Sequence, residues 1–134
     1  MAGIFFDTSV LVYMLSEADT RAEKAEALLT GGGVISVQVL NEFINVARRK
    51  YKMDWEELEE TLNDIRSICA SVLPIHLVDH ERALRLARRY GYRIFDALHI
   101  AVALGAGCHT FYSEDMQHGQ RIDGLTIVNP FAAN

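Results

Sequence analysis

The chain has 134 residues, of which 50% are hydrophobic and 23% are charged, and its formal net charge is −5 at pH 7. This length and composition predict one compact domain over residues 1–134 and exclude an intrinsically disordered protein. Two cysteines are too few for a disulfide scaffold. The negative charge argues, at first, against a partner as acidic as nucleic acid.

The sequence predicts a soluble, cytoplasmic protein without membrane contact. The first ten residues, MAGIFFDTSV, do not combine a basic segment with a long apolar one, so we expect no secretory signal there. The most apolar stretch, Ile94–Cys108, is interrupted by Asp96 and His99. It is also shorter than the ~20 residues that a membrane span needs. The low cysteine content fits the reducing cytoplasm.

Short apolar runs alternate with helix-length amphipathic stretches, which is typical of a parallel sheet covered by helices and predicts an α/β fold. We expect five strands, at Gly3–Phe6, Val34–Ser36, Val72–His76, Thr110–Tyr112 and Leu125–Val128. Between them we expect helices over Ser36–Tyr51, after a capping box formed by Asp54 and Glu57, after a cap at Asp79, and over Ile94–Leu104.

Two of these helices have informative faces. In the helix after Asp54, apolar residues that begin with Trp55 recur at steps of three and four, so we expect them to pack inward while the acids face solvent. The helix Ile94–Leu104, which includes Phe95, has no polar face and is expected to be buried.

Asp7 directly follows the first apolar run. Ligands of open α/β sheets bind at the carboxyl ends of the strands, where an acid is placed to meet one. The alternative role is a helix N-cap, although Thr8 and Ser9 can cap equally well and would leave Asp7 free.

Asp96 begins the apolar helix, and His99 is its polar neighbour one turn later. A buried carboxylate needs a partner, hydrogen bonds or a metal, so Asp96 is interpreted as a ligand or as a cap on the free N–H groups of the helix. His99 is interpreted as a core histidine rather than a ligand.

Two further acids have ordinary interpretations when taken singly. Glu42 lies on a polar stripe of its helix with Gln38 and Asn45, which is typical of a solvated acid. Asp115 follows the strand that ends at Tyr112, within Ser113-Glu114-Asp115, and turn chemistry alone can account for it.

The joint placement of these acids suggests a metal centre. Two of them follow strands, and two lie on the helices connected to such strands. Four converging carboxylates repel one another unless a cation neutralises them. Oxygen ligands favour Mg²⁺, with Mn²⁺ as the alternative, and the five histidines lack zinc-site spacing.

The segments IFFDTSVLVY, VLNEF, FDALHIAVA, YSEDMQHG and IVNPF, in this order, resemble the PIN domain, and in particular the VapC-type toxin ribonucleases of bacterial toxin–antitoxin pairs. The resemblance covers essentially the whole chain. It implies a three-layer α/β/α fold and an acidic quartet of Asp7, Glu42, Asp96 and Asp115. Ser113 matches the hydroxyl residue before the fourth acid, and Glu114 is an extra acid, either a second ligand or a solvated neighbour.

The resemblance also implies RNA as substrate, a cognate antitoxin and a homodimer. Metal ions held by the quartet would activate a water molecule that attacks the phosphodiester, with Thr8 and Ser9 either supporting the ligands or capping. Two basic clusters either face solvent or bind phosphates; they comprise Arg82, Arg85 and Arg89, and Arg48, Arg49, Lys50 and Lys52.

Two alternatives come from other function classes. The first is a catalytically silent binding module with the same fold, because acids alone do not show turnover. The second is a Mg²⁺-dependent phosphotransfer protein, although Ser9 stands where a haloacid-dehalogenase-like site needs a second aspartate.

The net charge also admits a second interpretation. Six acids, with no base between them, lie in the single helix after Met53: Asp54, Glu56, Glu57, Glu59, Glu60 and Asp64. Outside this helix and the proposed metal ligands the chain is basic, so its acidity does not exclude RNA.

Overall fold

The computed structural model describes residues 3–16 and 20–132. Within these residues six strands form one sheet in the order β3-β2-β1-β4-β6-β5. Neighbouring strands are parallel, except for the antiparallel pair β5 and β6. The predicted α/β class is therefore confirmed. The strands are β1 (Ile4–Phe6), β2 (Val34–Ser36), β3 (Ser71–Leu73), β4 (Thr110–Tyr112), β5 (Arg121–Ile122) and β6 (Leu125–Val128).

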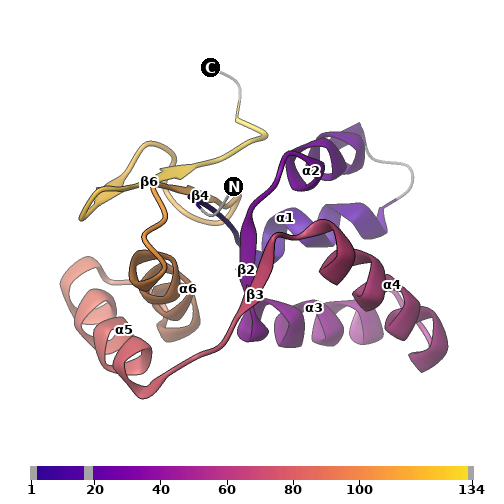
Figure 1. The fold of residues 1–134 in the computed structure, drawn as a ribbon, viewed down its shortest axis with the longest axis horizontal. Helices are drawn as coiled ribbons and strands as arrows, with labels where there is room; N and C mark the ends of the chain where they lie inside the picture. Colours follow the sequence, from indigo (N-terminus) through magenta and orange to yellow (C-terminus); the bar gives the residue numbers. More distant parts are fainter. Residues whose placement is uncertain (1–2, 17–19, 133–134) are drawn as a thin grey trace.

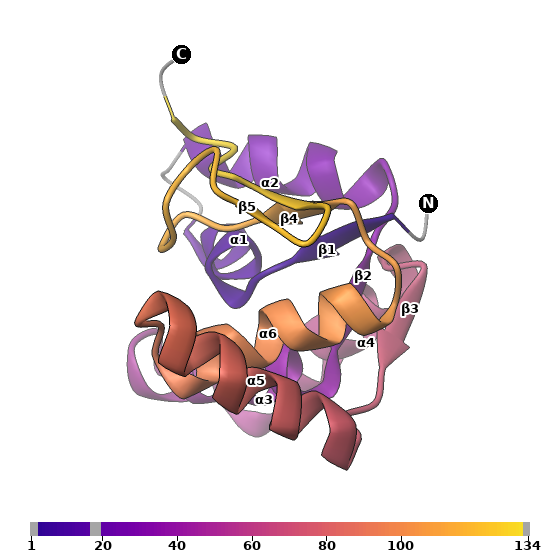
Figure 2. The ribbon, with the colours of Figure 1, turned by 90° about the vertical axis from the view of Figure 1, so that its left-hand side faces the viewer.

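Helices cover both faces of this sheet. Figure 1 shows α5 and α6 on one side and α1, α2 and α4 on the other. Figure 2, viewed from the first side, shows α5 and α6 running side by side below β1 and β4. The predicted three-layer arrangement is thus present. The helices are α1 (Thr8–Val12), continued by a 3₁₀ turn (Tyr13–Leu15), then α2 (Thr20–Thr30), α3 (Val37–Arg49), α4 (Trp55–Ile68), α5 (Leu77–Tyr90) and α6 (Ile94–Gly105). None of the helices in the described residues is long and apolar enough to cross a membrane.

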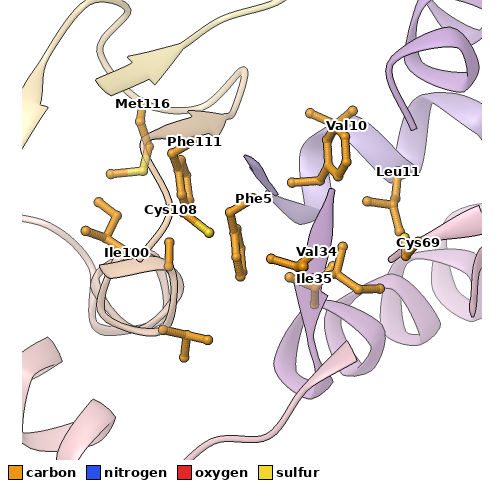
Figure 3. Close-up of a cluster of buried hydrophobic side chains, with 14 of the residues drawn as sticks. Phe5, Val10, Leu11, Val34, Ile35, Cys69, Ile100, Cys108, Phe111 and Met116 are labelled. Carbon is orange, nitrogen blue, oxygen red and sulfur yellow. The ribbon is translucent and has the colours of Figure 1, made fainter. Parts of the chain in front are cut away.

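The central strand β1 is buried on both faces. Phe5 and Phe6 have no exposed surface, and because successive strand residues point to opposite faces, each packs in a different layer. The ring of Phe5 stacks on Phe111 at 5.3 Å between centroids, and that of Phe6 on Tyr112 at 5.7 Å. Figure 3 shows Phe5 and Phe111 grouped with Ile100 of α6. A strand buried in this way holds its carboxyl end, where Asp7 begins, in one position.

The sixth strand was missed by the sequence analysis, which predicted five. β5 has only two residues, too few to show an alternating pattern. It pairs with β6 through a two-residue turn in which Asp123 and Gly124 have φ angles of 48° and 88°. These positive angles belong to the type I′ hairpin turn, for which Asp-Gly is a characteristic sequence. The Asp123-Gly124 dipeptide was therefore the feature of the sequence from which this hairpin could have been predicted.

Two predicted boundaries were wrong around Pro74. β3 runs over Ser71–Leu73 rather than Val72–His76, because proline has no N–H group to extend the strand ladder. α5 begins at Leu77 with His76 as its N-cap. Asp79 is therefore not the cap; it lies in the first turn and accepts the N–H of His76 at 2.9 Å.

Two aromatic side chains expected in the interior are exposed. Trp55 is 63% exposed, although Leu58 and Ile65 on the same stripe of α4 are buried. Arg48 covers its ring at 4.3 Å. Phe95 is 57% and Ile94 38% exposed, so the first turn of α6 is not buried as predicted. Farther along, Ala97 and His99–Ala103 are buried, and Leu98 and Leu104 are partly exposed. The capping box of Asp54 and Glu57 is present as predicted.

Candidate functional site

The strand order places a topological switch point between β1 and β4. From β1 the chain continues to β2 and β3 on one side, and later fills β4 and β6 on the other. Ligands of such sheets bind at the carboxyl ends of the strands flanking this point. Asp7 follows β1 and Ser113 follows β4. The backbone N–H of Asp7 donates to the carbonyl of Tyr112 at 2.9 Å, which ties the two strand ends together.

Asp7 is both the N-cap of α1 and the most strongly held acid of the site. Its Oδ1 accepts the backbone N–H of Thr8 at 2.8 Å. Its Oδ2 accepts the hydroxyls of Ser113 at 2.7 Å and Ser9 at 3.2 Å. Asp7 is only 3% exposed, and these three hydrogen-bond donors stabilise its buried carboxylate. The two roles weighed for Asp7 are therefore not exclusive.

Glu42 is brought to Asp7 by the helix that follows β2. Ser36 ends β2 and caps α3 through the N–H of Val39, and α3 then carries Glu42 to the site. Its Oε1 accepts the hydroxyl of Thr8 at 2.9 Å and contacts Nε2 of His99 at 3.0 Å. Gln38 donates to Oε2 at 3.2 Å. The interpretation of Glu42 as a solvated helix acid is wrong.

The hydrogen bonds of Glu42 also determine its charge. Burial raises the pKa of the Glu42 carboxyl, but the hydrogen bond from His99, the positive charge of that ring, and the hydrogen bonds from Thr8 and Gln38 act in the opposite direction and prevail. The net pKa lies below the usual value, so Glu42 is held as a carboxylate.

His99 belongs to the site, which the sequence analysis did not predict. Its side chain is 1% exposed, and its Nε2 lies 3.6 Å from Oδ1 of Asp7 as well as 3.0 Å from Glu42. Burial lowers the pKa of His99, but the hydrogen bond to Glu42 and the charges of Asp7, Glu42 and Asp96 raise it by more. The signal in the sequence was the spacing: residues three apart share a helix face, so an acid at 96 in the site implies a neighbour at 99.

The ligand atoms of Asp7, Glu42 and His99 all lie within 4.8 Å of one another, a spacing that can hold a metal ion. Nδ1 of His99, however, is buried and has no hydrogen-bond partner among the described residues. A metal-ligating histidine normally donates its other ring N–H to an acceptor. His99 therefore fits better as the donor of an Nε2–H bond to Glu42 than as a metal ligand.

Asp96 and Asp115 are the two acids of the site whose charged form the folded protein disfavours. Burial and the charge of Asp7 raise the pKa of both carboxyls, and Asp96 in turn raises that of Asp115. Glu42 adds to the shift at Asp96. The positive charge of Arg93 opposes the shift at both residues but does not cancel it. These mutual effects bring the four predicted acids into one electrostatic cluster.

The loop after β4 directs its two acids differently. Ser113 is fully buried and accepts the N–H of Asp115 at 3.1 Å while donating to Asp7. Glu114 instead accepts the hydroxyl of Tyr13 and pairs with Arg21 at 3.5 Å. Glu114 is thus engaged with a neighbouring cation and phenol and is not simply a solvated neighbour, while its role as a second ligand stays a prediction.

A scan against protein-family models matches residues 4–122 to the PIN domain. The chain belongs to the PIN domain family. A sequence search of the curated proteins finds no significant match.

Solved structures share this PIN fold. The Klebsiella pneumoniae toxin–antitoxin complex is similar with a TM-score of 0.73, at 21% identity, over 97% of this chain and 99% of its own. VapC20 of Mycobacterium tuberculosis, a toxin that cleaves the sarcin–ricin loop, has a TM-score of 0.67 at 21% identity, with 81% and 86% covered. DNA-bound VapBC of Salmonella typhimurium has a TM-score of 0.68 at 19% identity, with 95% and 97% covered. Likenesses at these identities establish the fold.

The repulsion at Asp96 gives a stability prediction for this PIN domain. Its folded pKa is raised above the value of 3.8 in an unfolded chain, so the folded state binds this proton more tightly and the free energy of unfolding falls as the pH rises through that interval. Asp96→Asn should therefore raise the melting temperature at pH 7 without divalent cations by ~4 °C, or about 1 kcal/mol.

Thermal denaturation monitored by circular dichroism checks this. The gain should shrink at pH 4 and disappear when Mg²⁺ is added to both proteins, and Asp64→Asn, an exposed acid of α4, should change nothing. A melting temperature for Asp96→Asn below that of the wild type at pH 7 without metal would contradict the account.

The position of His99 gives a second prediction. His99→Leu removes the donor to Glu42 and should weaken divalent-cation binding by roughly tenfold, the cost of one hydrogen bond to a charged group. His99→Gln retains an N–H donor and should lose less. Isothermal titration calorimetry with Mg²⁺ measures both affinities, and equal losses for the two variants would show that the donor is not what matters.

Proposed function

We propose that this PIN protein is a metal-dependent endoribonuclease and the toxin of a toxin–antitoxin pair. The supporting observation is the electrostatic cluster of four carboxylates from the end of β1, α3, α6 and the loop after β4, two of which have raised pKa values. A protein that maintains this repulsion when folded is suited to a cation that offsets it.

The residues present fit a hard divalent cation. Asp7, Glu42, Asp96 and Asp115 would hold it directly or through water, because Mg²⁺ and Mn²⁺ prefer carboxylate oxygens. Mg²⁺ is the proposed ion and Mn²⁺ the alternative. When bound, it would lower the pKa of a water molecule and stabilise charge on a phosphodiester.

Other side chains of the site would position the proposed metal ligands. The donors around Asp7 and Glu42 fix two carboxylates before any ligand arrives, which reduces the reorganisation needed at the reaction centre. Ser113 links the position of Asp7 to the loop that carries Asp115. His99 is committed to Glu42, so it orients a ligand rather than serving as a general base.

The substrate and partner are proposed from the fold relatives. VapC20 cleaves the sarcin–ricin loop, which supports RNA as the substrate of this chain. The neighbours from Klebsiella pneumoniae and Salmonella typhimurium are toxin–antitoxin complexes, which supports a cognate antitoxin. A homodimer and a cytoplasmic location remain predictions that accompany this function.

The nuclease proposal predicts that Asp7→Asn or Asp96→Asn lowers Mg²⁺-dependent RNA cleavage by at least about 100-fold, because each removes a charged metal ligand. Cleavage of labelled RNA by purified proteins, followed on denaturing gels, measures this. Asp64→Asn should cleave like the wild type. The assignment of these acids fails if either site variant retains wild-type cleavage, and a wild type without cleavage would favour the silent binding module.

The toxin proposal predicts growth arrest on expression of the wild type alone and relief on co-expression of the small protein encoded by the adjacent gene. Asp96→Asn should not arrest growth, although it folds. Colony counts after induction measure both effects. Arrest that persists with the products of both flanking genes would remove the toxin–antitoxin part and leave the nuclease part standing.

A further inference from the structure

Two cavities lie on either side of Glu42. The first, of about 560 Å³, opens between α1, α3 and the loop after β4; the second, of about 410 Å³, opens between α3 and the start of α6. Glu42 and Asn45 line both. Asp115 lines the first cavity and Asp96 the second. A ligand that occupies both cavities therefore passes directly over the acidic cluster.

Each cavity has a size suited to a small organic group such as a nucleotide. The first is lined by Lys50 and Tyr51 at the end of α3, and the second by Arg93 and Phe95 at the start of α6. Both cavities thus combine a cation and an aromatic ring with a shared acidic centre. This combination recurs in sites for single-stranded nucleic acid, where cations hold phosphates and rings stack on bases.

The charges lie where neighbouring phosphates would need them. Arg93 acts on the pKa of both Asp96 and Asp115, so its charge lies near both acids. Lys50 lines the first cavity together with Asp115, and its amine is 5.6 Å from the ring of Tyr51. A phosphodiester strand with one phosphate at the acids would place its next phosphates toward these two cations.

Phe95 is the sharpest indication of a ligand. It is 57% exposed and directly precedes Asp96; Ile94 before it is also exposed, at 38%, whereas the middle of the helix, Ala97 and His99–Ala103, is buried. No other aromatic ring stacks on it among the described residues. Trp55, the other large exposed ring, is covered by Arg48. Phe95 therefore offers an open apolar face at the edge of the second cavity.

Resting on the proposed nuclease function, we propose that the two cavities form one track for a single-stranded RNA segment. Phe95 stacks on a base on one side of the phosphate that is cut, and Tyr51 with Lys50 receives the nucleotide on the other. The amides of Gln38, Asn41 and Asn45 along the second cavity can donate to and accept from base edges. A duplex does not fit this arrangement, because its bases are already stacked on one another.

The test measures RNA binding separately from cleavage. An Asp7→Asn background keeps the RNA intact, and fluorescence anisotropy with a labelled single-stranded RNA in Mg²⁺ reports affinity. Adding Phe95→Ala should weaken binding by about tenfold, the contribution of one stacked base, whereas Phe95→Trp should retain it. Leu84→Ala is the matched control, since Leu84 is similarly exposed, at 52%, on α5.

Salt dependence tests the cations. Lys50→Gln and Arg93→Gln should each reduce the slope of log affinity against log salt concentration by about one, as expected for one lost phosphate contact. Arg66→Gln, an exposed base at the end of α4, should leave the slope unchanged. The duplex form of the same RNA should bind more weakly than the single strand and be insensitive to Phe95→Ala.

The outcomes separate this proposal from the one on which it rests. If the wild type cleaves RNA but Phe95→Ala binds it with unchanged affinity, the track is wrong and the nuclease stands. If Phe95→Ala weakens binding but the wild type cleaves nothing, the track stands and the nuclease is wrong. If Phe95→Ala weakens only the complex with the antitoxin, the surface belongs to that protein partner and the RNA track is overturned.

Discussion

Repulsion among carboxylates at the end of β1 is the constraint around which this PIN domain is organised. The fold brings four acids from distant parts of the chain close enough for their charges to act on one another, and burial there strengthens each unfavourable interaction. Two of them are compensated: Asp7 receives three hydrogen bonds, and Glu42 is held by Thr8, Gln38 and His99. Asp96 and Asp115 are not, and their raised pKa values record the remaining cost.

This division has a functional logic. In the proposed metal site, the carboxylates fixed by hydrogen bonds would keep the geometry of the centre, and relief of the repulsion at the uncompensated ones would contribute to the free energy of cation binding. The fixed pair depends on a chain of contacts that reaches into the sheet, since Ser113 and Asp7 are joined at the ends of paired strands. That pairing is in turn secured by Phe5 and Phe111, stacked in the core below.

The sequence predicted the parts of the fold that local patterns determine. Strand-length apolar runs identified five of the six strands, and the position of Asp7 after one of them placed it at a ligand-binding edge. Periodicity failed for Glu42 because it reports only which side of a helix is polar. It does not report that Thr8 and His99, 34 and 57 residues away in sequence, are brought to meet it. The predicted burial of Phe95 was wrong because an apolar sequence pattern predicts burial, even where no other part of the protein covers the side chain.

Charge is where composition and structure diverge most. The net charge of −5 describes the whole chain, but an RNA strand experiences the field near its own path, which the Debye length limits to about 10 Å. The acids of α4 are exposed on a separate helix, and in the proposed function a bound cation would neutralise those of the site. The cations that line the track are Lys50 and Arg21 on one side, the latter paired with Glu114, and Arg93 on the other. RNA binding should therefore be governed by metal occupancy and these three local cations, so an acidic protein can still bind a polyanion.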